Sequence, residues 1–467
     1  MPLRERRPDW RTQRRRNRVQ LLSGRIWRRR LVFWLGALCA GLLSVIFAEA
    51  ADWSQRTFAV ALWWSWWLPL LLTPLGFVAS SYLTQKFFPG SQGSGIPQAI
   101  AARHLRDTAE RRRLLSARMI VGKIGLTLVG LLCGASVGRE GPTVQVGAAI
   151  MVQVANLGGL RHERGLILAG SAAGIAAAFN TPLAGIVFAI EELSRSFEQR
   201  TNGLVLYAVI ISGLVSLGLS GNYTYFGSAP AAPSAPGDWL MVVACGALGG
   251  IAGGLFSRLL LCGSRRIKRW TLGQLGWQSL TLALVCGVVV AVIGVLTDGA
   301  TFGTGYEQAR GAVEGHPIAW FFWPAKLAAT LLTALSGIPG GIFAPSLAVG
   351  AGLGGWLDLL GASSSPGLAA VLGMAGYFAG VVQAPITASV IILEMTGNHN
   401  NVIPVMMAAV VGFGTSKLIA HEPLYHGLAR GFVDDAHKRA MSSRYVPHPE
   451  EADEQEDTAL SRTPVAD

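Results

Sequence analysis

Residues 138–142 read Gly138-Arg139-Glu140-Gly141-Pro142 and stand between two long apolar segments. An ionisable side chain inside an apolar stretch costs free energy, so Glu140 marks a candidate functional site. The Gly-Pro pair interrupts the chain and precedes an apolar, helix-like segment. The N-terminus of a helix carries unsatisfied N–H groups and a partial positive charge, which stabilise a carboxylate. Because the same groups bind free anions, the sequence predicts that Glu140 and an anion compete for one place.

The composition around this motif is that of a membrane protein. Of the 467 residues, 51% are hydrophobic and 14% are charged, and the mean hydropathy is +0.42. Soluble chains carry about 25% charged residues. These values exclude disordered, collagen-like and secreted disulfide-rich chains. They indicate an all-α, multi-pass membrane protein, which is also unusually rich in glycine, with 58 residues.

The apolar stretches are interrupted by glycine and proline. Five stretches lack Asp, Glu, Lys and Arg: residues 57–85, 201–237, 270–297, 327–357 and 359–393. A helix needs about 20 residues to cross a bilayer. Interrupted backbone is tolerated at membrane depth only inside protein or beside a water-filled cavity. We therefore expect short, tilted, broken helices, with cytoplasmic loops at the basic clusters 103–118 and 258–269.

The two ends of the chain carry opposite charge. Residues 1–30 hold twelve arginines and two acids, and residues 434–467 hold nine acids and four bases. A basic arm can bind nucleic acid. Here it directly precedes the apolar run 31–50, which favours a cytoplasmic N-terminus in contact with anionic lipid, and no nucleic acid. That run is too closely followed by further apolar segments to be a cleavable signal peptide. We expect the acidic tail to be disordered and to add no regulatory domain.

The chain contains an internal repeat. Residues 142–148 (PTVQVGA) resemble residues 345–351 (PSLAVGA), at an offset of 203. Three further pairs keep the same offset: Gly170 with Gly373, Pro182 with Pro385 and Glu191 with Glu394. We predict two membrane repeats, 31–220 and 237–433. Transporters built from repeats with interrupted segments bind substrate at the repeat interface, near the bilayer midplane.

Other patterns carry weaker signals. The Gly-rich turns 93–97 and 337–345 also precede apolar segments, although for any one turn helix packing through small residues is an alternative. The five cysteines lie in or beside apolar segments without a CxxC motif, and indicate neither a disulfide nor a metal site. Residues 350–355 contain GxGxxG but lack the preceding strand of a dinucleotide site.

The ordered set of three Gly-rich motifs and a tyrosine resembles the CLC family of chloride channels and transporters, across residues 31–433. The motifs are residues 93–97 (GSGIP), 138–142 (GREGP) and 340–345 (GGIFAP), followed by Tyr425. The resemblance implies an inverted repeat, a homodimer with one anion pathway per subunit, and both termini in the cytoplasm. It implies chloride and protons as substrates and no cofactor. The absence of added cytoplasmic domains favours a bacterial protein of the inner membrane.

The resemblance also implies roles for single residues. Chloride would contact the hydroxyls of Ser94 and Tyr425, with Gly95 beside the serine. The backbone N–H groups of Ile342 and Phe343 would complete the site. A serine at position 94 implies chloride, because nitrate-selective relatives tend to have proline there and the fluoride branch has methionine.

For the proton, the resemblance makes Glu140 the gate and external proton carrier, supported by Gly138 and Gly141. Glu192 would be the internal proton-transfer residue of an exchanger, where channels generally have an apolar residue, and Glu191 would position it or hydrate its route.

Lys123 and Arg139 would shape the electrostatics of the site. One departure concerns proton access: many exchangers have glutamate where Gln98 stands, and often an acid at the position of Ile100.

Three hypotheses remain open. The first is a secondary active chloride/proton antiporter, and therefore not an enzyme. The second is a passive chloride channel with the same anion site, which Glu192 disfavours and Gln98 favours. The third, an intramembrane hydrolase, rests on Ser136 in a GxSxG pattern that lacks a strand–turn–helix context and a His/acid pair.

Overall fold

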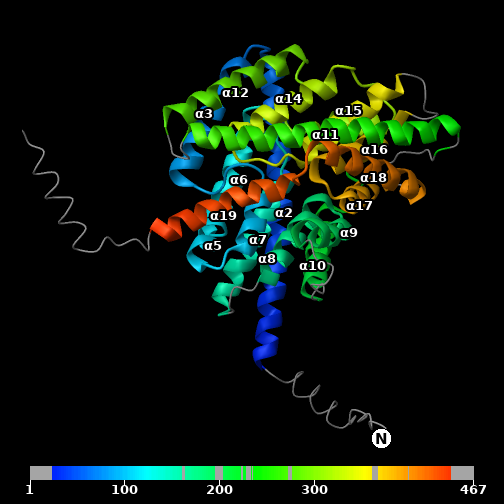
Figure 1. Cartoon of the computed structure of the whole chain (residues 1–467). Helices are drawn as coiled ribbons and strands as arrows, with labels where there is room; N and C mark the ends of the chain where they lie inside the picture. Colours follow the sequence, from blue (N-terminus) through cyan, green and yellow to red (C-terminus); the bar gives the residue numbers. More distant parts are fainter. Residues whose placement is uncertain are drawn as a thin grey trace, which may run out of the picture.

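The computed structural model describes residues 24–442, except for 160–163, 195–202, 222–223, 228–232, 234, 272–275, 360–365 and 398. In this range the chain folds into tightly packed helices (Figure 1). Residues 1–23 of the basic arm and 443–467 of the acidic tail lie outside it, so the predictions for those residues concern a part of the chain that the structure does not describe.

The first half of the chain supplies the helices up to α10. They are α2 (Gly24–Trp64), α3 (Pro69–Phe87), α4 (Ile96–His104), α5 (Thr108–Leu114), α6 (Ala117–Leu132), α7 (Glu140–Leu157), α8 (Arg164–Phe179), α9 (Pro182–Phe188) with its π-helical continuation η1 (Ala189–Ser194), and α10 (Gly203–Ser220).

The second half supplies the remaining helices. They are α11 (Pro236–Trp270), α12 (Trp277–Leu296), α13 (Tyr306–Val313), α14 (Phe322–Leu335), α15 (Phe343–Asp358), α16 (Pro366–Val382), α17 (Pro385–Thr396), the 3₁₀ turn η2 (His399–Asn401), α18 (Val402–Ile419) and α19 (Leu424–Ser442).

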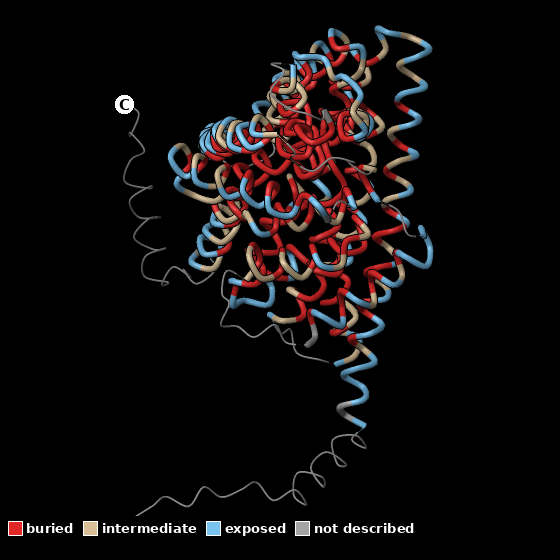
Figure 2. The backbone as a smooth tube through the Cα atoms, turned by 90° about the vertical axis from the view of Figure 1, so that its right-hand side faces the viewer, coloured by how far each residue is buried: buried red, intermediate tan, exposed pale blue. Residues whose placement is uncertain are grey.

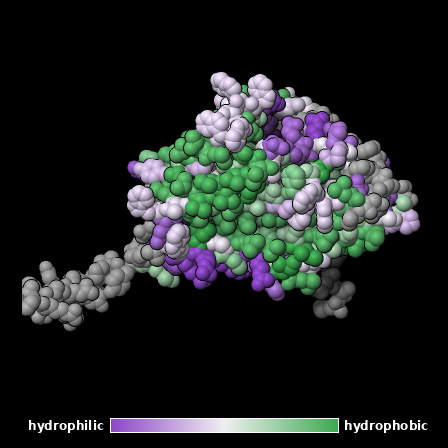
Figure 3. All heavy atoms as spheres, turned by 90° about the horizontal axis from the view of Figure 1, so that it is seen from above, coloured by the Kyte–Doolittle hydropathy of each residue, from purple (hydrophilic) through white to green (hydrophobic). Residues whose placement is uncertain are grey.

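The prediction of broken helices is confirmed. Pro182 and Pro385 each open a short helix, because a proline in the first turn has no N–H to satisfy. Among the described residues, five helices are long and apolar enough to span a membrane, and several shorter apolar helices, such as Phe322–Leu335, accompany them. Buried backbone concentrates in the interior and exposed backbone on the outer helices (Figure 2). From above, a broad hydrophobic area lies beside hydrophilic clusters (Figure 3), as expected of a surface that meets lipid.

Three predicted boundaries are wrong. The basic cluster 258–269 is not a loop but the last turns of α11, where Lys268 and Arg269 complement the negative end of the helix dipole. The cluster 103–118 is only partly a loop, since it contains α5. The predicted disordered tail begins too early, because α19 continues through residue 442. Arg439 of α19 pairs there with Glu110 of α5 at 2.7 Å.

The helices approach one another through glycine. A Cβ atom on Gly147 of α7 would overlap the carbonyl oxygen of Gly170 in α8, and the reverse substitution would overlap that of Gly147. The corresponding residues of the second half, Gly350 of α15 and Gly373 of α16, contact each other in the same way. The predicted repeat is therefore present in the packing, and the GxGxxG pattern at 350–355 belongs to a helix interface.

The two halves exchange equivalent contacts. The carboxylate of Glu191 accepts hydrogen bonds from the amides of Ile386 (3.2 Å) and Thr387 (2.6 Å), at the start of α17. Its repeat partner Glu394 accepts from the amides of Leu183 (3.0 Å) and Ala184 (2.7 Å), at the start of α9. Each acid thus caps a helix of the other half, a reciprocity expected for halves related by a local two-fold axis.

The Glu394 cap yields a prediction about stability. Glu394→Ala removes the acceptor of two amides at a helix N-terminus, and the loss of such a cap costs about 0.5–2 kcal/mol. We expect the free energy of unfolding to fall by about 2 kcal/mol, measured as a lower midpoint of thermal unfolding in detergent. Glu307→Ala, which removes an exposed carboxylate of α13, is the control and should leave the midpoint unchanged. Equal midpoints for both variants would contradict the capping role.

Candidate functional site

Backbone hydrogen bonds bring the three Gly-rich motifs together. The amide of Gly93 donates to the carbonyl of Ile338 (3.1 Å), and the amide of Gly340 donates to the carbonyl of Gly93 (3.0 Å). Gly138 and Gly341, which occupy equivalent positions in the two repeats, exchange a reciprocal pair of 2.6 and 2.7 Å. Motifs some 200 residues apart in the sequence therefore form one site between the halves.

Three helices begin at this site. Gly95 is the N-cap of α4, Arg139 that of α7 and Ile342 that of α15, whose first residue is Phe343. The backbone of Gly95 has φ of +104°, and a Cβ atom there would lie 2.7 Å from the carbonyl oxygen of Gly141. Glycine is thus required for the helix ends to approach. The converging N-termini create a positive electrostatic environment without a formal charge.

Two hydroxyl groups lie at the same place. The side chain of Ser94 is buried against Gly141, and Tyr425, the second residue of α19, is fully buried. Among the described residues, neither hydroxyl has a hydrogen-bond partner at bonding distance. The Tyr425 hydroxyl lies beside Ser94 and within electrostatic range of Glu140 and Glu192. Buried hydroxyls without protein partners are costly, so these two are suited to a bound ligand that accepts hydrogen bonds.

The Glu140 carboxylate is folded over the site. Glu140 is the first residue of α7 and is 1% exposed. A Cβ atom on Gly138 would overlap its Oε2 atom. The carboxylate faces the amides of Glu140 itself and of Ala344, in the first turns of α7 and α15. The carboxylate therefore lies at the starts of α7 and α15, and its competition with an anion for this place stays a prediction.

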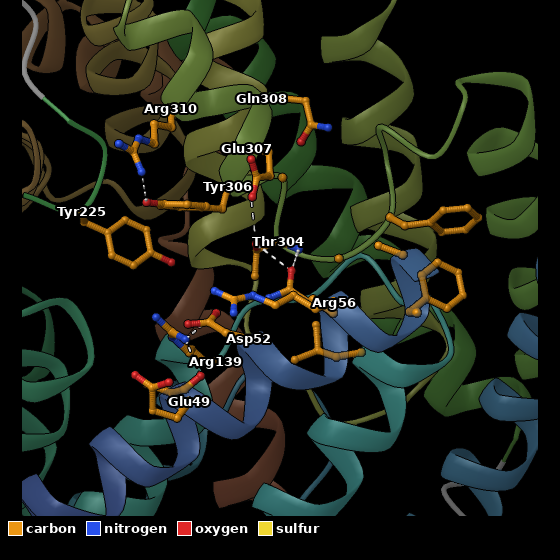
Figure 4. Close-up of a pocket in the computed structure, with 18 of the residues that line it drawn as sticks. Glu49, Asp52, Arg56, Arg139, Tyr225, Thr304, Tyr306, Glu307, Gln308 and Arg310 are labelled. Carbon is orange, nitrogen blue, oxygen red and sulfur yellow. Dashed lines mark hydrogen bonds and ion pairs between the residues drawn. The ribbon is translucent and has the colours of Figure 1, made fainter. Parts of the chain in front are cut away.

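Arg139 forms its ion pair with Asp52 and not with Glu140. Its guanidinium pairs with Asp52 of α2 at 2.8 Å and donates to the carbonyl of Ala48 at 2.6 Å, and it lies over the ring of Tyr225. Arg139 lines a cavity of about 700 Å³, which is bounded by α2 and by the segment around α13. We name it the α2 cavity, and Figure 4 shows Arg139 at its lower edge. Glu49 and Arg310 line the same cavity. Arg139 thus lies between the site and the charged α2 cavity, and it supports the site without forming part of it.

Lys123 and Gln98 hold the loop that carries Ser94. The ammonium of Lys123 donates to the carbonyls of Ser91 (2.7 Å) and Gly93 (2.6 Å).

The amide nitrogen of Gln98 donates to the carbonyls of Gly90 (3.2 Å) and Gln92 (2.5 Å), while its oxygen accepts from the amide of Gly95 (3.1 Å). A carboxylate could not donate to those carbonyls. Gln98 therefore has a structural role that requires a glutamine. The neighbouring residues in the sequence do not predict this role. Ile100, two residues later, is buried in the apolar core.

A second cavity approaches the site from another direction. It has a volume of about 410 Å³ and is lined by Ser94, Gly340 and Ile342, by the last turns of α11, and by Gly427 and Gly431 of α19. We name it the α19 cavity. Arg139 lines the first cavity and Ser94 the second, so the two cavities approach the site at different residues.

Glu192 lies in η1, with a fully buried side chain. His426, which follows Tyr425, contacts it: the imidazole Nε2 is 2.8 Å from the Glu192 carbonyl oxygen and 3.8 Å from its carboxylate Oε1. Sequence reasoning missed His426, because a histidine in a polar segment next to the tyrosine carries no pattern that links it to position 192. Glu191, the residue before, caps α17 as described above.

Ser136 of the GxSxG pattern is also placed. Its buried hydroxyl bonds to the hydroxyl of Thr330 at 2.9 Å, so the group that shares its proton is another hydroxyl and not an imidazole. This arrangement gives no support to a nucleophilic role.

Comparison with known proteins identifies the family. The family described as voltage gated chloride channel matches residues 75–417. This chain belongs to the CLC family. It is 32% identical over 432 residues to the H(+)/Cl(−) exchange transporter ClcA of Citrobacter koseri, covering 87% of this chain and 89% of that protein. The corresponding protein of Salmonella gallinarum is 30% identical over 460 residues, covering 93% and 96%.

Solved CLC structures have the same fold. A slow cyanobacterial Cl−/H+ antiporter superposes with a TM-score of 0.74 at 23% identity, covering 87% of this chain and 98% of that one. A CLC-type fluoride/proton antiporter gives a TM-score of 0.71 at 27% identity, covering 85% and 96%. The predicted fold class, a CLC-type membrane fold of short broken helices, is confirmed.

The packing of Gly141 against Ser94 yields a second prediction. In Gly141→Ala, the added Cβ atom would overlap the Ser94 hydroxyl and press on its carbonyl oxygen. We expect chloride affinity, measured by calorimetric titration of the purified protein, to fall at least tenfold. Gly125→Ala is the matched control, because a Cβ atom at that position in α6 meets nothing within 4 Å. Unchanged affinity in the Gly141 variant would show that the anion does not bind beside Ser94.

Proposed function

We propose that this protein is a secondary active chloride/proton antiporter. The relatives named H(+)/Cl(−) exchange transporters support the reaction, since they align over nearly their whole length. The residues of this chain support it independently. Helix N-termini converge around the buried Glu140, and a second buried acid, Glu192, lies in η1, so the chain offers groups for an anion and for a proton.

Chloride binds at the converging N-termini in this proposal. The hydroxyls of Ser94 and Tyr425 donate to it, and the amides of Ile342 and Phe343 complete the shell. Because these donors are neutral groups and helix dipoles, the ion is held without a fixed cation and can leave again. The α19 cavity leads to Ser94, and the α2 cavity leads to Arg139.

Protons pass between two carboxylates. Deprotonated Glu140 occupies the place of an anion at the starts of α7 and α15. Protonation removes its charge, so the amides lose their preference for it and chloride replaces it. Glu192 receives the proton on the other side of Tyr425. The single observation that carries the proposal is the burial of two acids, Glu140 at the converging helix N-termini and Glu192 in η1, in one chain.

The alternative is a passive chloride channel with the same anion site. A channel needs the helix ends and hydroxyls but no second buried acid. Glu192, fully buried and contacted by His426, has no use in a pathway for chloride alone. The antiporter is therefore the better account.

The membrane arrangement follows from charge. The Arg-rich flank of α2 supports a cytoplasmic N-terminus, and the positive-inside rule assigns the basic end of α11, which lines the α19 cavity, to the same side. The α19 cavity then opens to the cytoplasm and the α2 cavity to the outside. We propose a homodimer in the inner membrane of a bacterium, with one pathway per subunit and with anionic lipid at the basic arm.

The first test measures coupling directly. Purified protein in liposomes, given a chloride gradient and no proton gradient, should move protons in the direction opposite to chloride, even against an opposing membrane potential. A pH electrode and a chloride electrode record the two fluxes together. Chloride flux without driven proton flux would establish the channel instead.

The second test separates the two acids. Glu192→Gln should lower the ratio of proton to chloride flux at least tenfold while chloride flux continues, because the proton loses its internal acceptor. Glu140→Gln should abolish proton coupling and leave chloride flux that no longer depends on external pH, because the gate can no longer change its charge. Coupling that persisted in Glu140→Gln would contradict the gate assignment.

A further inference from the structure

The proposed function leaves Glu192 without a supply of protons. Its side chain is 1% exposed, so it does not exchange protons with cytoplasmic water by itself. A side chain that contacts both Glu192 and more open surroundings would connect the two. At the two positions where exchangers often carry acids, this chain has Gln98, which is bonded into the loop before α4, and Ile100, which is packed in the core.

His426 has the required position. Its side chain is 18% exposed, and its Nε2 atom lies 3.8 Å from Oε1 of Glu192 and 2.8 Å from the backbone carbonyl oxygen of the same residue. We propose that His426 is the proton-transfer residue that loads Glu192 from the cytoplasm. This inference rests on the proposed antiport.

The transfer balances without another reactant. A proton from cytoplasmic water binds Nδ1 of the neutral imidazole, whose Nε2–H donates to the Glu192 carbonyl. A small rotation of the ring or of the carboxylate brings Nε2 into contact with Oε1. The Nε2–H bond breaks, the proton forms an O–H bond on Glu192, and the imidazole is left neutral with its proton on Nδ1. Exchange with water restores the first tautomer. Histidine suits this step, because an imidazole can accept a proton on one ring nitrogen and release one from the other.

The charged groups on the surrounding elements contact other residues or are exposed. On α4, Arg103 donates to the carbonyl of Leu193, and His104 is exposed. On α11, Arg265 pairs with Glu422, which also pairs with Arg430 of α19 at 2.8 Å. In η1, Glu191 caps α17. The described part of α16, which also packs against α19, has no charged side chain. Glu192 is thus the acid that His426 faces.

The proton route is separate from the chloride route. On α19, the lining of the α19 cavity is formed by Gly427, Leu428, Gly431, Phe432 and Asp435. His426 reaches η1 instead, so one helix serves chloride on one face and the proton on another. Changing His426 should therefore alter proton delivery and leave the anion path intact.

The test compares two substitutions in liposomes that hold the full-length protein. His426→Gln keeps a donor for the Glu192 carbonyl but cannot be protonated, and we expect the ratio of proton to chloride flux to fall at least tenfold, with chloride flux within twofold of the wild type. His426→Glu restores a titratable group, and we expect coupling to recover with its internal-pH midpoint shifted to lower pH. His421→Gln, at an exposed histidine just before α19, is the control and should behave as the wild type.

The outcomes separate the two proposals. Wild-type protein without chloride-driven proton flux would overturn the antiport itself. Normal coupling in His426→Gln would overturn the role of His426 and leave the antiport standing. Loss of both fluxes in His426→Gln, or equal loss of coupling in the glutamine and glutamate variants, would make the residue structural and would also overturn the inference.

Discussion

The reciprocal hydrogen bonds between Gly138 and Gly341 hold the centre of the molecule together. They join equivalent residues of the two halves directly before the helices α7 and α15 begin. Because both segments turn into helices there, the bonds fix two positive helix ends against each other in the interior. The positive ends would repel unless negative charge lay between them. Glu140 supplies that charge within the protein, and chloride supplies it in the proposed transport cycle.

The rest of the site is built to keep this centre open to anions. Lys123 and Gln98 hold the Ser94 loop by its carbonyls, which leaves the serine hydroxyl directed to the site. Arg139 is bound to Asp52 and Ala48, so the nearest guanidinium does not neutralise Glu140 by a direct ion pair. A strong ion pair would fix the proposed gate in one state. In the proposed cycle, the charge that changes is thus surrounded by neutral donors.

Much of the fold and site could be predicted from the sequence. Glu140 could be predicted as a site residue, because an acid between glycines in an apolar run is too costly to be retained without a function. The repeat could be predicted, because matched glycines and prolines of the two halves, such as Pro182 and Pro385, lie at a constant offset in the sequence. The ends of the helices could not be predicted in the same way. A cluster of charged residues suggests a loop, whereas α11 and α19 carry their basic residues on helices that extend beyond the apolar region. The hydrogen bonds of Gln98 and the contact of His426 with Glu192 depend on the tertiary fold. The local sequence around these residues carries no pattern that predicts them.

The glycine contacts between α7 and α8, and between α15 and α16, have a genetic consequence. Any missense change of a glycine codon introduces a side chain, since every other amino acid carries a Cβ atom. At Gly147, Gly170, Gly350 and Gly373 that atom would meet backbone of the facing helix, which no rotamer change can relieve. These codons therefore have no neutral amino-acid replacement. The gene should tolerate variation on its lipid-facing surface and almost none along these seams.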